Sequence, residues 1–128
     1  MMHGMDEEHF TISQVAARLG IEADTLRYYE RRHVVPSPSR DAAGRRCYDA
    51  NQVHLLEVLL HLKRTGMPLA AIADFTRLVA TDPDGVPERL ALLQQHRDRI
   101  LAQRRILEDS LQVVEQKIHD YQARLQLD

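Results

Sequence analysis

Residues 10–32 read FTISQVAARLGIEADTLRYYERR, and this stretch decides the fold. Ser13, preceded by Thr11, is a typical residue for capping the start of a helix, and Gly20 readily takes the left-handed conformation that ends one. A short first helix is therefore expected between them. Its apolar stripe consists of Val15, Ala16 and Leu19.

The segment 24–32 predicts a second helix. Leu26 and Tyr29 are spaced to pack inward, which leaves Arg27 and Tyr28 just beside the packing face. Two short helices joined by a tight glycine turn indicate a helix-turn-helix. An Arg and a Tyr beside the packing face suit a DNA-recognition helix, because phosphates bind guanidinium groups and base edges accept hydrogen bonds.

A small β-hairpin is expected next. Pro36 and Pro38 forbid a continued helix, and residues 39–48 predict two strands that turn at Gly44. A hairpin this short needs a helix to pack on. The side chains expected to flank a DNA backbone are Arg40, Arg45 and Arg46.

Two more helices complete this part of the chain. Asp49 and Gln52 form a capping box that starts a third helix, which ends at Gly66, and Pro68 starts a fourth. The expected core positions are Val53, Leu56, Leu60 and Lys63 on the third helix and Leu69, Ile72, Phe75 and Leu78 on the fourth. A third basic zone consists of Lys63, Arg64 and the loop 65–67.

A long helix is predicted beyond the turn-rich segment 81–87. An apolar seam with alternating steps of three and four runs along it through Leu90, Leu93, Arg97, Ile100, Arg104, Leu107, Leu111, Val114, Ile118, Tyr121 and Leu125. Such a heptad seam requires a partner helix, and the chain offers no second long helix. We therefore expect a homodimeric coiled coil, and an antiparallel one could place acids opposite Arg97 and Arg104.

Composition limits the class of protein. The 128 residues carry a net charge of −2, so the protein is not basic overall, but basic residues outnumber acidic ones between residues 9 and 70. No apolar run is long enough to span a membrane and the first residues do not resemble a signal peptide, which predicts a cytoplasmic protein. We expect a disordered tail at 1–8, a DNA-binding domain at 9–80, a linker at 81–87 and a dimerisation helix at 88–126.

Three segments, LRYYE at 26–30, GRRCY at 44–48 and TGMP at 65–68, resemble the MerR family of winged-helix regulators. The resemblance covers nearly the whole chain. It implies a mainly α fold, in which a winged helix-turn-helix head with a β-hairpin wing precedes a helix that forms an antiparallel coiled coil in a homodimer. The segment KIHDYQARL resembles short members without an effector domain, which respond to aldehydes or nitrosative stress.

The function that the resemblance implies is regulation of transcription. Such a dimer binds duplex promoter DNA whose two core elements are spaced too far apart, and distorts it so that RNA polymerase can use it when an effector is bound. By motif, Arg27, Tyr28 and Tyr29 would contact DNA from the recognition helix, Arg40, Arg46 and Tyr48 from the wing, and Lys63 near a second wing. With the other cations, the expected contacts are Arg18, Arg27, Tyr28, Tyr29, Arg40, Arg45, Arg46, Tyr48, Lys63 and Arg64. Truncating Arg27 or Arg46 is expected to weaken DNA binding without lowering the melting temperature.

Three positions depart from the family pattern. Glu22 stands where a Ser or Thr helix cap is usual, and Arg45 where a wing tyrosine is usual. His33 stands where Gly is usual after the recognition helix, so a non-Gly residue is expected to adopt a left-handed conformation there.

Other chemistries are less well supported. His54, Glu57 and His61 step along one side of the third helix, but a polar stripe explains them better than a metal site. Cys47, the only cysteine, and His61, where a sensing cysteine is expected in related short regulators, are the candidate redox or effector positions, and an inert Cys47 is favoured. We expect no cofactor and no enzymatic activity. The alternatives left open are an architectural or excisionase-like DNA-binding factor and a coiled-coil protein-interaction module.

Overall fold

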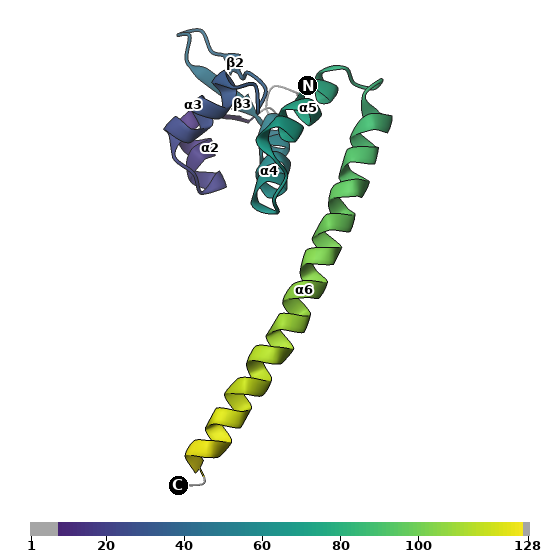
Figure 1. Ribbon diagram of the computed structural model, residues 1–128. Coiled ribbons are helices and arrows are strands. Elements are labelled where there is room, and N and C mark those ends of the chain that lie inside the picture. The colour runs from purple at the N-terminus through teal and green to yellow at the C-terminus, as the bar shows by residue number, and fades with distance from the viewer. Residues whose placement is uncertain (1–7, 127–128) are drawn as a thin grey trace. The chain divides into compact units, whose positions relative to one another are not determined.

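The computed structural model describes residues 8–126, so the tail expected at 1–8 lies almost entirely outside the described residues. The chain forms two compact units, one up to Leu90 and one from Ala91. The elements of the first unit are β1 (His9–Phe10), α2 (Ile12–Leu19), α3 (Ala23–Arg31), β2 (Ser39–Arg40), β3 (Arg46–Asp49), α4 (Ala50–Arg64) and α5 (Leu69–Ala80) (Figure 1). The helix α6 (Val86–Gln126) begins in that unit and forms the second.

Helix α2 begins two residues earlier than the sequence suggested, because its N-cap is Thr11 and not Ser13. The Thr11 hydroxyl accepts a hydrogen bond from the backbone N–H of Gln14 (3.1 Å), and the Gln14 side chain accepts one from the N–H of Thr11 (2.8 Å). This reciprocal pair satisfies two backbone donors that a helix start otherwise leaves unpaired. The expectation that Ser13 caps the helix is wrong, since Ser13 lies inside it.

The turns around α3 follow the expected backbone conformations. Gly20 ends α2 in the left-handed region with φ +72°. His33, beyond the end of α3, has φ +59°, which confirms the left-handed conformation expected of it. There the backbone N–H of Val34 donates to the carbonyl of Tyr29 (2.9 Å), which folds the chain back over the end of α3.

The sheet has three antiparallel strands in the order β1-β3-β2. The hairpin of β2 and β3 pairs Ser39 with Cys47 and turns through Gly44, as expected. The strand β1 was not predicted. It pairs Phe10 with Tyr48, and two residues are too short for the alternation by which strands are recognised in a sequence.

The core of the first unit lies between α2, α3, α4 and α5. Its buried apolar side chains are Val15, Ala16, Leu19, Leu26, Val34, Val35, Tyr48, Val53, Leu56, Leu59, Leu62, Met67, Ile72 and Phe75. Leu59 and Leu62 are the buried side chains in the second half of α4, whereas Leu60 is half-buried and Lys63 exposed. The expectation that Lys63 and Leu69 occupy core positions is therefore wrong, because the buried stripe of α4 lies one residue earlier and Leu69 sits at the solvent-exposed start of α5.

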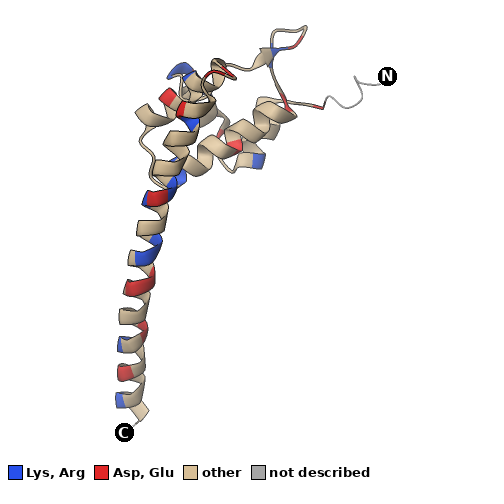
Figure 2. Ribbon diagram, turned by 90° about the vertical axis from the view of Figure 1, so that its right-hand side faces the viewer, with Lys and Arg blue, Asp and Glu red and all other residues tan. Residues whose placement is uncertain are grey.

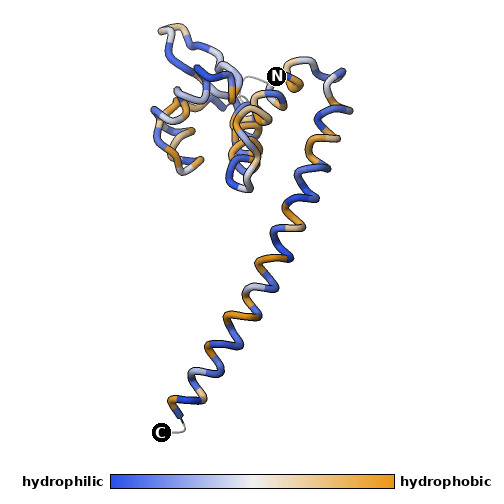
Figure 3. Tube along the Cα trace, viewed as in Figure 1, coloured by the Kyte–Doolittle hydropathy of each residue, from blue (hydrophilic) through white to orange (hydrophobic). Residues whose placement is uncertain are grey.

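Helix α6 runs for 41 residues, and hydrophobic and charged bands alternate along it (Figures 2 and 3). The seam side chains beyond Ile100 are exposed on this single chain, as are the neighbouring Ile106 and Val113. Both arginines of the seam have acidic partners on their own helix. Arg104 lies 3.5 Å from Glu108, and Arg97 lies 3.3 Å from Asp98. The sequence analysis expected acids from a partner helix opposite these two arginines. Since both have an acidic partner on their own helix, such acids are not required.

Replacing Thr11 with Ala should lower the free energy of unfolding by about 1 kcal/mol, since an N-cap and half of a capping box are lost. Ser13→Ala is the matched control, because Ser13 is exposed within α2 and should change stability by less than about 0.5 kcal/mol. Urea unfolding followed by circular dichroism compares the two. Equal losses for both variants would contradict the cap assignment.

Candidate nucleic-acid interface

A basic hollow opens where the start of α2 meets α3 and the wing, which is the hairpin of β2 and β3. It encloses about 870 Å³ counting its open side. Its walls are formed by Thr11, Ile12, Arg27, Arg40, Asp41, Gly44, Arg45 and Arg46. Four guanidinium-bearing side chains and one carboxylate surround a space that takes up several solvent molecules or an anionic group. The hollow therefore suits a polyanion such as a nucleic-acid backbone.

The arginines of the wing are held by its turn. The Asp41 carboxylate accepts hydrogen bonds from the backbone N–H groups of Arg45 and Ala43, both 2.9 Å, and pairs with the Arg45 guanidinium at 3.2 Å. The hydrogen bond from the backbone N–H of Arg45 is the main reason why the pKa of Asp41 lies below its ordinary value. Across the turn, Arg40 donates to the carbonyl of Gly44 (3.1 Å). The wing thus presents both cations from a turn organised by one ionised carboxylate.

Arg46 joins the wing to α3. Its Nε lies 2.7 Å from a carboxylate oxygen of Glu30, and the two side chains are only 21% and 14% exposed. Next to this pair Tyr48 is 3% exposed, and burial, with a further contribution from the Glu30 charge, raises the pKa of its hydroxyl. The expectation that Tyr48 contacts DNA is therefore wrong in this fold, because the side chain lies in the core. Arg46 borders the hollow, but its guanidinium forms an ion pair with Glu30.

The outer face of α3 carries an aromatic-cationic cluster. Tyr28 is exposed, and the guanidinium groups of Arg31 and Arg32 lie 6.0 and 5.8 Å from the centre of its ring. Arg27 is partly exposed on the same helix and pairs with Asp24 at 2.7 Å. Sequence reasoning chose Arg27 and Tyr28 but omitted Arg31 and Arg32, although their positions three and four residues beyond Tyr28 predict this contact.

The remaining predicted contact residues, three cations and Tyr29, have different surroundings. Arg64 donates to the carbonyl of Leu19 (3.1 Å), so its guanidinium closes the end of α2 rather than standing free for DNA. Lys63 is exposed at the end of α4. Arg18 lies over the ring of Phe10, 5.9 Å from its centre. Tyr29 is half-buried and faces the interior of the head, next to Leu26 and Val34.

The candidate metal and thiol positions do not converge. In the part of the chain that the structure describes, no group of three or more His, Cys, Asp or Glu side chains is placed to hold a metal ion, and this includes His54, Glu57 and His61. Cys47 is half-buried in β3 opposite Ser39, as expected of a structural residue. His61 is exposed on α4, far along the helix from the strand that carries Cys47.

Comparison with known proteins matches this architecture. Residues 10–78, more than half of the chain, match the MerR HTH family regulatory protein domain. The chain belongs to the MerR family. An HTH-type transcriptional regulator of Haemophilus influenzae is 32% identical over 113 residues, which cover 88% of this chain and 84% of the relative.

Solved MerR structures share the fold over most of the chain. The crystal structure of HiNmlR, a MerR family regulator lacking the sensor domain, bound to promoter DNA, has a TM-score of 0.83 at 31% identity and covers 90% of this chain and 91% of its own. A MerR family regulator from Bacillus thuringiensis has a TM-score of 0.81 at 29% identity, covering 88% and 99%.

Membership of the MerR family makes this chain a transcription regulator rather than an enzyme, in agreement with the sequence analysis. The mainly helical fold, with its small antiparallel sheet and long C-terminal helix, is confirmed as well. Among the helices of residues 8–126, none combines the length and apolar character that a membrane crossing requires.

Arg46→Ala should lower the free energy of unfolding by about 2 kcal/mol, because it leaves the Glu30 carboxylate mostly buried without its partner. Because of this ion pair, the structure leads to a different prediction from the sequence, which gave no reason to expect a lower melting temperature for this substitution. Arg45→Ala is the matched control, since the Arg45 side chain is 79% exposed and its loss should hardly affect stability. Thermal unfolding of the two variants measures the difference, and an unchanged melting temperature for Arg46→Ala would refute a structural role for the pair.

Proposed function

We propose that this protein is a homodimeric transcription regulator that binds duplex promoter DNA through the basic hollow and the outer face of α3. The observation that carries the proposal is the convergence of Arg27, Arg40, Arg45 and Arg46 on one open hollow beside the recognition helix. Arginine is the side chain best suited to grip phosphate, because its planar fork donates two parallel hydrogen bonds.

The contacts divide by their surroundings. Arg27, Arg40 and Arg45 would bind phosphates of the DNA backbone, and the exposed ring of Tyr28 would lie against the groove that α3 enters. Lys63 and Arg18 would add cations at either side. Three of the expected contact residues would support this surface. Arg46 holds the wing against α3, Tyr48 is part of the core, and Arg64 binds the carbonyl at the end of α2.

Promoter DNA is favoured over other polyanions by the relative HiNmlR, whose structure contains it. We infer that, as in the MerR resemblance, the dimer distorts the promoter spacer so that RNA polymerase can initiate. The partners proposed are therefore promoter DNA, a second copy of the chain and RNA polymerase. Residues 9–80 would bind the DNA, 81–87 would link, and 88–126 would dimerise.

Arg27→Ala should weaken binding to a fragment from upstream of the protein's own operon by about tenfold and reduce the salt dependence by about one ion. The reason is the loss of one phosphate contact. Arg105→Ala is the control, because Arg105 is exposed on α6 and belongs to neither the hollow nor α3. Gel-shift titrations at several salt concentrations compare them. Failure of the unmodified protein to bind any promoter fragment at low salt would exclude this function and the architectural alternative together.

Dimerisation is proposed through the seam of α6. The seam residues assigned to the interface are Leu90, Leu93, Ile100, Leu107, Leu111, Val114, Ile118 and Tyr121. Most of these side chains are half or more exposed on the single chain, which is unfavourable in water unless a second helix covers them. A partner helix from a second copy covers the same residues on both chains and needs no other protein.

Leu107→Lys should convert the dimer to a monomer, since the interface loses two leucines, one from each copy, and gains two charges. Ile106→Lys is a closely matched control, because Ile106 is 64% exposed, nearly as much as Leu107 at 69%, but lies off the seam. Light scattering after size-exclusion chromatography gives the mass. If both variants keep the mass of a dimer, the seam is not the interface.

A further inference from the structure

Every arginine that lines the basic hollow already donates to an oxygen of the protein itself. Three of the four pair with a carboxylate, and the fourth, Arg40, donates to the carbonyl of Gly44 (3.1 Å). The pairs are Arg27 with Asp24 (2.7 Å), Arg45 with Asp41 (3.2 Å) and Arg46 with Glu30 (2.7 Å). The guanidinium fork binds carboxylate and phosphate oxygens in the same way. In the protein alone, the carboxylates therefore hold places that phosphates of a nucleic acid would take.

The ion pairs of the hollow differ in how far water reaches them. Arg46 and Glu30 are mostly buried, so a polyanion could take Arg46 only by leaving a desolvated carboxylate unpaired. The side chain of Arg45 is 79% exposed and that of Asp41 35%. A pair this exposed contributes little free energy, because water and salt compete for both charges. Arg45 can therefore exchange its carboxylate for a phosphate at low cost, whereas Arg46 cannot.

The two oxygens of the Asp41 carboxylate have separate roles. Oδ1 accepts hydrogen bonds from the backbone N–H groups of Ala43 and Arg45, both at 2.9 Å, and so closes the tip of the wing. Oδ2 accepts one from the Nε–H of Arg45 at 3.2 Å. The backbone of Asp41 is bound as well, since its N–H donates to the carbonyl of Arg45 and its carbonyl accepts from the N–H of Gly44, both at 2.9 Å. Oδ2 can therefore lose the guanidinium while Oδ1 keeps the turn in place.

We propose that Asp41 positions the wing for DNA with one oxygen and limits its affinity for DNA with the other, by occupying the Arg45 guanidinium until a phosphate displaces it. Binding at this point is then an exchange of partners rather than the addition of a free cation. The carboxylate that Arg45 leaves stays in the hollow, where its charge opposes that of the phosphate. The contact of Arg45 with DNA therefore contributes less than the exposure of its side chain suggests.

This inference rests on the proposed function, and it concerns this chain rather than the MerR family as a whole. Arg45 stands where a wing tyrosine is usual, and a tyrosine cannot form this ion pair. An arginine at this place would by itself strengthen binding to any DNA, because phosphate contacts carry no sequence information. Asp41 offsets that added charge from within the same turn. It therefore keeps the affinity of the wing for arbitrary DNA low.

Asp41→Asn separates the two roles, because asparagine keeps Oδ1 as an acceptor and replaces Oδ2 with an amide that cannot accept the Nε–H of Arg45. It should tighten binding to the upstream promoter fragment about threefold and steepen the salt dependence by about one ion, since the hollow gains one net positive charge. Asp41→Ala removes the same charge but also both turn hydrogen bonds, so it should bind the fragment about threefold more weakly than Asp41→Asn. Gel-shift titrations at several salt concentrations measure both variants.

Asp74→Asn is the matched control. Asp74 forms an exposed ion pair with Arg77 on α5, and neither residue lines the hollow. The substitution removes one negative charge from the same head, so it reports on the overall charge alone. The affinity for DNA should stay unchanged.

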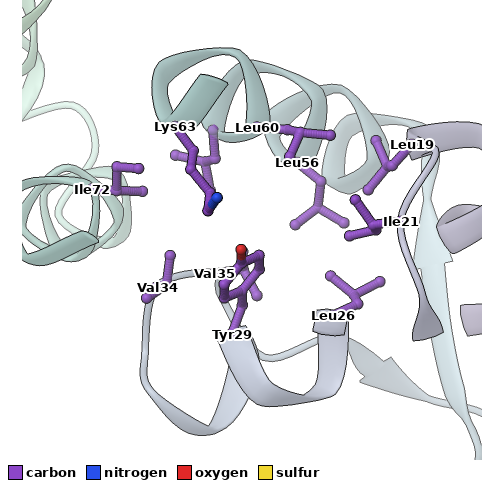
Figure 4. A pocket seen from close by; sticks show the side chains of 11 residues that line it. Leu19, Ile21, Leu26, Tyr29, Val34, Val35, Leu56, Leu60, Lys63 and Ile72 are labelled. Atoms are coloured by element: carbon purple, nitrogen blue, oxygen red, sulfur yellow. The ribbon is translucent and has the colours of Figure 1, made fainter. Parts of the chain in front are cut away.

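Substitutions at Asp41 should leave the head folded, because the packing that holds the recognition helix lies elsewhere. Figure 4 shows Leu26 and Tyr29 of α3 facing Leu56 and Leu60 of α4, and Asp41 takes no part in this contact. The melting temperatures of the variants check that this packing is intact.

NMR spectra test the two oxygens directly. In the protein without DNA, the backbone amides of Ala43 and Arg45 should exchange with water at the unmodified rate in Asp41→Asn and about tenfold faster in Asp41→Ala. The Nε–H signal of Arg45 should move in both variants. Addition of DNA to the unmodified protein should move the Nε–H signal as well and leave the two amides protected.

The outcomes separate this inference from the proposed function. If the promoter fragment binds but Asp41→Asn is no tighter than the unmodified protein, or Asp74→Asn tightens binding equally, the limit on affinity is refuted and the proposed function stands. Equal affinities of Asp41→Asn and Asp41→Ala would overturn the positioning role. If no DNA fragment binds at low salt, the proposed function fails, and with it the exchange at Arg45, while the amide exchange rates still decide whether Asp41 holds the turn.

Discussion

The ion pair between Glu30 and Arg46 connects the two parts of the head that form the basic hollow. Glu30 is in the last turn of α3 and Arg46 begins β3, so the 2.7 Å contact fixes the wing against the recognition helix. Both side chains have lost most of their water, and each would be strongly destabilising alone. The wing can therefore take few positions against α3 without breaking this desolvated pair. Tyr48 is buried beside the pair, and burial raises the pKa of its hydroxyl above a value at which it is already neutral near pH 7.

Features that depend on a few neighbouring residues could be predicted from the sequence. The capping box of Asp49 and Gln52 and the turn at Gly44 are decided by local backbone chemistry, whereas the left-handed His33 was expected from the Gly usual at that place in the MerR family. Some errors were local, such as the choice of Ser13 as the cap, but those at the basic hollow concern contacts between distant residues. The sequence does not reveal that Arg46 meets Glu30 or that Arg64 reaches the carbonyl of Leu19, because both depend on packing of separate elements.

Helix α6 is governed by a different constraint from the head. Its seam is apolar, yet the seam is interrupted at Arg97 and Arg104, whose partners Asp98 and Glu108 lie on the same helix. Exposed pairs of this kind contribute little to stability, so they do not hold the helix together. They do allow the arginines to remain at the edge of a seam without an unpaired charge. In the proposed dimer, specific pairing of two copies would then depend on the uninterrupted stretch from Leu107 to Leu125.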